Sequence, residues 1–119
     1  MYVSGVVACL CTCPDEATAS RIARALVDER LAACVNLLPG VRSIYRWQGA
    51  VEEAGEILLL IKTTRTTLPA LRARLVALHP YELPELLAVE AADGLPAYLA
   101  WIADNAGGAG AAPDPENDA

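Results

Sequence analysis

The sequence predicts a single α+β domain in which the elements follow one another in the order βαββαβ, with one more helix at the end. Three observations support this order. Residues 13–32 and 66–79 carry apolar residues at the spacing of amphipathic helices. The segments around them are rich in β-branched and other apolar residues, as strands are. Residues 57–61 are apolar at every position, which is typical of a strand covered on both faces.

The first two elements are a strand and a helix. Residues 2–12 have strand character on both faces, so we expect this strand to lie at the centre of the sheet. Within the helical segment 13–32, Pro14 is expected at the first helical position, where its missing N–H is not needed. Asp15 and Glu16 follow in the first turn, where acidic side chains interact favourably with the helix dipole.

The second strand, expected over residues 33–49, is predicted to be bent. Pro39 has no N–H to donate to a neighbouring strand, and Gly40 tolerates unusual backbone dihedrals. We therefore expect a bulge at this point and a position at the edge of the sheet. Residues 48–49 are expected to form a hairpin turn into the third strand, residues 50–64.

The remaining elements are a second helix, a fourth strand and a third helix. Leucines recur at helical spacing in residues 66–79 and give this helix an inward stripe: Leu68, Leu71, Leu75 and Leu78. Pro80 ends the helix. Residues 82–92 are predicted to be the fourth strand. Residues 95–106 are predicted to be a short helix with an apolar side made of Leu95, Tyr98, Leu99 and Ile102.

This order of elements fits a ferredoxin-like plait, an antiparallel sheet with two helices packed on one face. The helices leave the other face uncovered. Because residues 57–61 are apolar on both sides, that face would expose a large hydrophobic surface, which in a soluble protein usually marks an interface. The edge strand around residues 36–40 would also offer unpaired backbone groups to another subunit. We therefore expect self-association.

The composition limits what the protein binds and where it acts. With 119 residues, 55% of them hydrophobic, the chain fits one domain, expected over residues 1–106. Residues 107–119 contain acidic but no basic residues and little to bury, so we expect a disordered acidic tail. The net charge of −6 disfavours nucleic acids and anionic membranes as partners. No stretch is apolar enough to cross a bilayer and no secretory signal is recognisable, so we expect a cytoplasmic protein.

The cysteines and the single histidine are the candidates for a reactive or metal-binding site. Cys9, Cys11 and Cys13 alternate along the first strand, so successive thiols are about 6.8 Å apart, a poor geometry for a disulfide. We expect reduced thiols that are mostly buried. His79 has three open roles: a metal ligand, an acid or base, or the last residue of its helix, where its partial charge would favour the helix dipole.

Polar residues follow His79 in the segment that leads into the fourth strand. Tyr81 is expected to pack rather than to act in catalysis, and Glu82 to be solvated. Glu85 is expected at the start of a buried strand, where its charge would need a partner such as Lys62 or an arginine of another subunit. Glu82 and Glu85 could also bring carboxylates to a metal ion held by His79.

Three stretches form a specific combination in their order and spacing: "LCTCPDEATASRIARALVDERLAACVNLLPGVRSIYRWQG", then "LLIKTT", then "HPYELPELL". The most distinctive parts are "LAACVNLLPG", Y-x-W-x-G and "HPYELPE". Together they resemble the CutA divalent-cation tolerance proteins over about residues 5–105. The resemblance implies a ferredoxin-like protomer in a tight homotrimer, in which long hairpin strands pair across subunits.

The resemblance also implies a role in tolerance of copper or another divalent metal ion, without an established reaction, so we do not expect an enzyme. In bacterial members of the family, copper binding is assigned to the cysteine of an LCT motif and to two adjacent histidines before a PY pair. These positions correspond here to Cys11, Leu78 and His79, so one imidazole is missing. Thiolate and imidazole are ligands that favour copper. Cys9 and Cys13 could join Cys11 if their face of the strand opens to solvent.

A second interpretation is a small-molecule sensor or protein-interaction scaffold like the PII signalling proteins. These proteins share the plait and the trimeric arrangement, and they bind ligands in clefts between subunits. A phosphate-bearing ligand would need a basic cleft, which the sequence could supply only if four cations converge: Arg42, Arg46, Lys62 and Arg65. A thiol–histidine enzyme is disfavoured, because no residue is recognisable that would orient His79 toward Cys11.

Overall fold

The structure is a computed structural model that describes residues 4–107. Its elements are β1 (Val6–Cys13), α1 (Glu16–Asp28), β2 (Cys34–Trp47), β3 (Ala50–Thr64), α2 (Leu68–Leu78), β4 (Leu87–Glu90) and α3 (Pro96–Asn105). This is the predicted order, and the α+β class is confirmed. The predicted acidic tail lies outside the described residues, apart from Gly107. Within residues 4–107, no helix has the length and apolar character that a membrane span requires.

The strands form one four-stranded antiparallel sheet in the order β2-β3-β1-β4. β1 is therefore interior and β2 lies at an edge, as predicted. The pairing of β2 with β3 shifts register between Leu38 and Val41, which confirms the bulge, and Gly40 there has a φ of 78°. Gln48 and Gly49 form the hairpin turn with φ values of 49° and 84°. Two successive positive φ angles match the twist of a two-residue hairpin.

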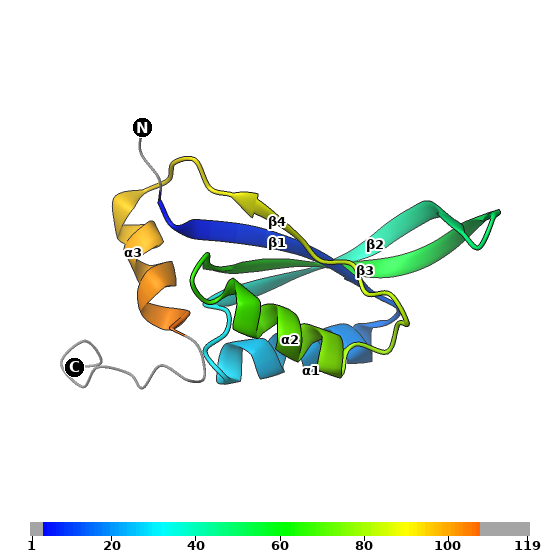
Figure 1. Ribbon diagram of the computed structural model, residues 1–119, viewed down its shortest axis with the longest axis horizontal. Coiled ribbons are helices and arrows are strands. Elements are labelled where there is room, and N and C mark those ends of the chain that lie inside the picture. The colour runs from blue at the N-terminus through cyan, green and yellow to red at the C-terminus, as the bar shows by residue number, and fades with distance from the viewer. Residues whose placement is uncertain (1–3, 108–119) are drawn as a thin grey trace.

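Helices α1 and α2 lie side by side on one face of the sheet, while the β2–β3 hairpin projects past them at one end and α3 lies at the other (Figure 1). The side chains of β1 that face the helices are Val7 and the thiols of Cys9, Cys11 and Cys13, and the three thiols are fully buried. Beside them in register are Ile61 and Leu59 of β3. The two helices close this core with large side chains that are fully buried, among them Ile22, Leu26, Leu71 and Leu75. The leucine stripe of the second helix is thereby confirmed.

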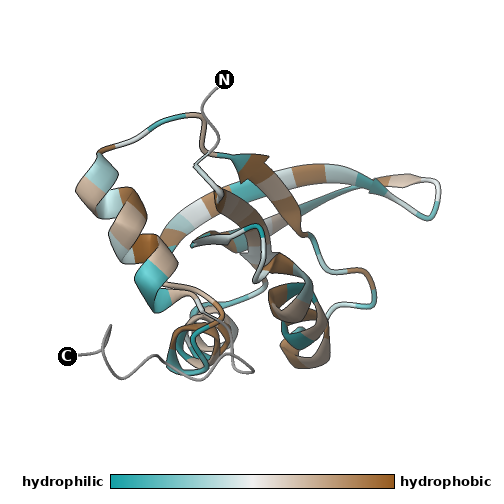
Figure 2. Ribbon diagram, turned by 60° about the vertical axis from the view of Figure 1, so that its left-hand side comes forward, coloured by the Kyte–Doolittle hydropathy of each residue, from teal (hydrophilic) through white to brown (hydrophobic). Residues whose placement is uncertain are grey.

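Helices α1 and α2 leave the opposite face of the sheet open, and α3 packs against it only at one end, around Val6 (Figure 1). Leu58 and Leu60 of β3 point to this face and are only half-buried. Leu10 of β1 pairs with Leu60 on one side and with the exposed Leu87 of β4 on the other. Hydrophobic residues run along these strands, whereas they alternate with hydrophilic ones along the hairpin (Figure 2). Within residues 4–107, the apolar run of β3 is therefore covered on one face only.

The start of α1 differs from the prediction. The helix begins at Glu16, and Asp15 is its N-cap, with its carboxylate accepting the N–H of Thr18 at 2.7 Å. Pro14 precedes the cap instead of occupying the first helical position. An aspartate side chain satisfies a free N–H of the first turn, which gives it a strong preference for the cap position.

β4 and α3 also differ from the prediction. β4 contains only four residues, and all are exposed, so the expectation of a long buried strand is wrong. This strand lies at the sheet edge, and Pro84, which cannot donate to a ladder, precedes it. In α3, Leu95 is the N-cap and is 71% exposed, because its extended backbone before Pro96 takes it off the helical face. Leu99 and Ile102 supply the buried contacts.

Candidate metal centre

The end of α2 brings the histidine to the end of β1. His79 is the C-cap of α2 and has extended dihedrals, φ −81° and ψ 137°, as expected for a residue before proline. Its position at the helix end is thus confirmed. The extended backbone carries the imidazole into the core, where Nε2 lies 2.8 Å from the carbonyl oxygen of Thr12. His79 is only 7% exposed.

Cys11, Cys13 and His79 form a buried cluster. Their ligand atoms all lie within 4.8 Å of one another, and Cys13 Sγ is 3.9 Å from His79 Nε2. Of all groups of histidine, cysteine and acidic side chains in residues 4–107, this is the one trio with metal-binding geometry. The structure thus brings together the two ligands predicted from the sequence and, of the two thiols that could join them, Cys13. Cys9, further along the same face, is not part of the cluster.

The hydrogen bonds of His79 assign its tautomer. Tyr81 N–H can only donate, and it lies 3.2 Å from Nδ1, so this nitrogen accepts. The Thr12 carbonyl can only accept, so Nε2 carries the proton. An imidazole that accepts at Nδ1 and donates at Nε2 is neutral. The ring therefore makes these two hydrogen bonds in place of the expected interaction of a charged imidazole with the helix dipole. A metal ion at Nε2 must displace the proton and the hydrogen bond to Thr12.

The thiols of β1 differ in how readily they ionise. Burial raises the pKa of Cys9 to about 11. A hydrogen bond with Cys13 raises the pKa of Cys11, and burial raises it further. The same hydrogen bond lowers the pKa of Cys13. Of the three thiols, Cys13 is therefore the one whose pKa lies below its ordinary value. All three are free thiols, as expected.

A cavity of 680 Å³ opens beside the cluster, between the hairpin and the segment after His79. Thr12, which separates the two clustered cysteines in sequence, lies in its wall. Glu56 of β3 also lines it, is only 9% exposed, and accepts a hydrogen bond of 2.6 Å from the Tyr81 hydroxyl. Burial and this hydrogen bond raise the pKa of Tyr81. The centroids of the Tyr81 and His79 rings are 4.7 Å apart, which confirms that Tyr81 packs as predicted.

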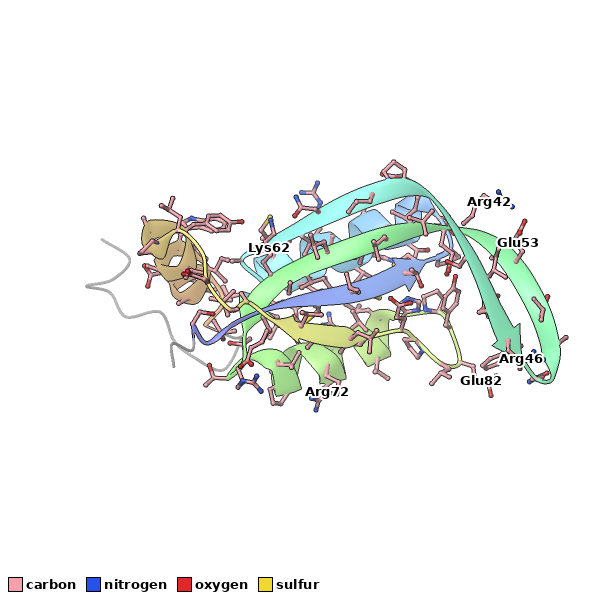
Figure 3. The ribbon with its side chains drawn as sticks, turned by 90° about the horizontal axis from the view of Figure 1, so that it is seen from above. Arg42, Arg46, Glu53, Lys62, Arg72 and Glu82 are labelled. Atoms are coloured by element: carbon pink, nitrogen blue, oxygen red, sulfur yellow. The ribbon has the colours of Figure 1, made fainter. Side chains whose placement is uncertain are left out.

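The charged residues of the cavity are mostly acidic. Glu82 and Glu85 join Glu56 in its wall, with Arg46 as the one basic residue there. Arg46 on the hairpin and Glu82 on the facing segment lie near each other (Figure 3). Glu82 is exposed, as predicted, whereas Glu85 is half-buried ahead of β4. Lys62, one of the two partners suggested for Glu85, instead donates to the Tyr98 hydroxyl at 3.2 Å. The other suggested partner, an arginine of another subunit, stays a prediction.

The basic residues do not converge into a phosphate cleft. Arg42 pairs with Glu53 at 3.0 Å on the hairpin, and Arg65 pairs with Glu90. Lys62 lies near α3, at the opposite end of the molecule from Arg42 (Figure 3). Within residues 4–107 of a single chain, these cations therefore do not form a phosphate-binding cleft, and a cleft shared between subunits stays a prediction.

The comparison with known families is decisive for the classification. A sequence model described as CutA1 divalent ion tolerance protein matches residues 7–105. The chain belongs to the CutA1 family. The resemblance predicted from the "LCT", "LAACVNLLPG" and "HPYELPE" stretches is thus confirmed.

Relatives from several kingdoms support the assignment. The CutA1 chain is 55% identical to a divalent-cation tolerance protein CutA of Thermus thermophilus, over 82% of this chain and 95% of that one. A solved structure of such a protein from this organism superimposes with a TM-score of 0.83 at 53% identity, covering 84% and 97% of the two chains. Protein CutA of Homo sapiens is 48% identical over 85% of this chain and 57% of its own length.

An archaeal structure extends the comparison. It is described as the periplasmic divalent cation tolerance protein CutA of Archaeoglobus fulgidus, and it matches with a TM-score of 0.79 at 34% identity, over 82% of this chain and 94% of the archaeal one. The fold of the described residues is therefore shared by bacterial and archaeal members of the family.

Proposed function

We propose that this CutA1 chain acts in metal tolerance by binding a divalent cation, with copper as the ion named by the family resemblance, through Cys11 and His79. The observation that carries the proposal is the buried cluster in which the thiol and the imidazole lie within 4.8 Å of each other. Thiolate sulfur and imidazole nitrogen are soft and borderline ligands that suit transition metals. Binding requires the Cys11 thiol to lose its proton and the Nε2 proton of His79 to be displaced.

The acidic cavity supports access of a cation to this site. Glu56, Glu82 and Glu85 outnumber Arg46 in its wall, and a concave surface of one charge sign raises the local concentration of counter-ions. Thr12 connects the cavity wall to the strand that carries Cys11. No residue of the cluster needs a catalytic partner for this role, so we propose binding and not catalysis.

The same proposal includes a ferredoxin-like protomer in a homotrimer that acts in the cytoplasm without nucleic-acid or membrane partners. The open sheet face supports assembly, because Leu87 and Val89 of β4 are exposed on or beside it. Ile44 and Val51 are exposed on the projecting hairpin, at the sheet edge where strands of another subunit could pair. The archaeal relative described as periplasmic makes cell fractionation the appropriate test of location.

Metal analysis and titration test the proposal. Protein purified without added metal is analysed for bound ions, and copper is titrated into wild type, Cys11→Ser and His79→Ala. We expect the wild type to bind and each variant to lose most of its affinity. Cys9→Ser is the matched control, because Cys9 is equally buried on the same face of β1 but lies outside the cluster. Equal binding by all four proteins would refute the site.

A small-molecule ligand is the second candidate, and the cavity is the observation that favours it. Its volume lies within the range of ligand pockets, and it combines Tyr45, Trp47 and Tyr81 with carboxylates. This lining suits a cationic ligand better than the phosphate-bearing ligands expected of a PII-like sensor. A thermal-shift panel of cationic and phosphorylated metabolites tests it. Stabilisation by phosphorylated compounds alone would contradict the charge argument.

A further inference from the structure

We propose that Cys13 is a third metal ligand, which makes the buried cluster a site with two thiolates and one imidazole for a thiophilic divalent d¹⁰ ion such as Zn²⁺ or Cd²⁺. This inference rests on the proposed function, because it takes Cys11 and His79 as ligands. It adds a ligand that the family's copper pattern does not contain and selects a different class of ion.

The distances fit such a site. In a tetrahedral zinc site with Zn–S of about 2.3 Å and Zn–N of about 2.0–2.1 Å, two sulfurs lie about 3.8 Å apart, and a sulfur and a nitrogen about 3.6 Å apart. Cys13 Sγ and His79 Nε2 are already 3.9 Å apart, and the widest pair in the cluster is no more than 4.8 Å apart. A contraction of about 1 Å therefore completes the three-ligand geometry. The C-x-C spacing on β1 places both thiols on the same side of the strand.

The charge balance also favours three ligands. Cys11 and Cys13 have no exposed area, so an uncompensated charge at the site would be costly. One thiolate and a neutral imidazole leave a divalent ion with one positive charge, whereas two thiolates neutralise it. Zinc and cadmium ions do not oxidise thiolates, while Cu²⁺ held by two thiolates tends to oxidise them. The donor set therefore fits a redox-inert thiophilic ion.

The protons and hydrogen bonds can be followed through the binding step. Two metal–sulfur bonds form, and the protons of the two thiols leave to solvent. The Nε2 proton of His79 moves to Nδ1, so the bonds to the Thr12 carbonyl and from the Tyr81 N–H are broken and one metal–nitrogen bond forms. The fourth position of a tetrahedral ion is left for water.

Cadmium titration measures the number of thiolate ligands directly. The protein is titrated with Cd²⁺ in the presence of a competing chelator, and the ultraviolet thiolate-to-cadmium charge-transfer absorption is recorded per bound ion. The proteins compared are wild type, Cys11→Ala, Cys13→Ala, His79→Ala and the control Cys9→Ala. We expect Cys13→Ala to lose about half of the absorption per bound ion and to bind at least about 100-fold more weakly, and Cys9→Ala to match the wild type.

The outcomes separate this inference from the proposed function. If wild type shows no thiolate absorption and no cadmium affinity, this inference fails, and the copper titration decides the proposed function separately. If Cys11→Ala and His79→Ala lose affinity while Cys13→Ala keeps the wild-type absorption and affinity, the metal site stands and the third ligand is refuted. Circular dichroism verifies the fold of each variant. If Cys13→Ala does not fold, Cys13→Ser, which replaces only the sulfur atom, is measured against Cys9→Ser by the same criteria.

Discussion

The open face of the sheet provides a direct test of self-association. Leu87 of the edge strand β4 is 61% exposed and sits on this face beside Leu10 of β1, its partner in register. Replacing it by glutamate places a carboxylate where a second subunit would cover the sheet. We expect Leu87→Glu to prevent assembly of the proposed trimer without unfolding the protomer, because the side chain is mostly exposed in its own chain.

The size of the effect follows from the exposed area. Burying a whole leucine side chain contributes about 1.5–3 kcal/mol, so the exposed part of Leu87 contributes about 1–2 kcal/mol per subunit on assembly. Three substituted copies in a trimer lose about 3–6 kcal/mol, before the cost of burying a carboxylate is added. At about 1.4 kcal/mol per factor of ten, the trimerisation constant falls by at least about 10²- to 10⁴-fold.

Sedimentation equilibrium at micromolar concentration measures this change. Wild type is expected as a trimer and Leu87→Glu as a monomer with unchanged circular dichroism. Val76→Glu is the matched control, because Val76 is 55% exposed on α2, away from the open sheet face. A monomeric wild type, a trimeric Leu87→Glu or equal dissociation of Val76→Glu would refute the assignment of this face to the interface.

Three further predictions follow from single residues. Leu78→His restores the second imidazole of the family's copper pattern and should tighten copper binding in titrations. Because Leu78 is half-buried against the core, the same change should lower the free energy of unfolding in urea by about 1–2 kcal/mol. Unchanged copper affinity in a folded variant would contradict this role. Asp15→Ala removes the N-cap of α1 and should lower the free energy of unfolding by about 1 kcal/mol, whereas Asp15→Asn, which keeps an acceptor, should lose less; equal losses would show that the cap is not the cause. Burial raises the pKa of Cys9 from 9.0 to about 11, so the folded state holds the thiol proton more tightly than the unfolded state does. The free energy of unfolding should therefore fall by about 2–3 kcal/mol as the pH rises from the lower of these pKa values to the higher. Urea unfolding as a function of pH checks this, and Cys9→Ala should flatten the corresponding part of the profile.

The features that the sequence predicts well are those set by a few neighbouring residues. The Pro39–Gly40 pair predicts the bulge, and Pro80 predicts both the end of α2 and the extended conformation of His79. The helix start was predicted less well, because Pro14 and Asp15 both favour a helix N-terminus and only the hydrogen bond to Thr18 decides between them.

Features that depend on distances between elements could not be predicted in this way. Because side chains alternate along a strand, Cys9, Cys11 and Cys13 lie on one face of β1. Which of these thiols contact His79 depends on the point along β1 that the end of α2 reaches. The basic residues fail to converge for a similar reason. Arg42 of β2 lies opposite Gly55 of β3 in the strand register, and Lys62 follows Gly55 by seven residues along β3. At 3.3 Å per residue, Gly55 and Lys62 are therefore about 23 Å apart.

The structural and functional interpretations of His79 depend on the same geometry. Pro80 forces an extended backbone on His79, and this conformation both ends the helix and directs the ring toward Thr12 and Cys13. In the metal-free protein the two hydrogen bonds of the ring satisfy a buried polar side chain, with a net contribution of about 1 kcal/mol each. Because structural zinc sites bind with about 10 kcal/mol or more, exchange of these two hydrogen bonds for metal coordination is energetically accessible. A residue that stabilises the metal-free fold can therefore also serve as a metal ligand.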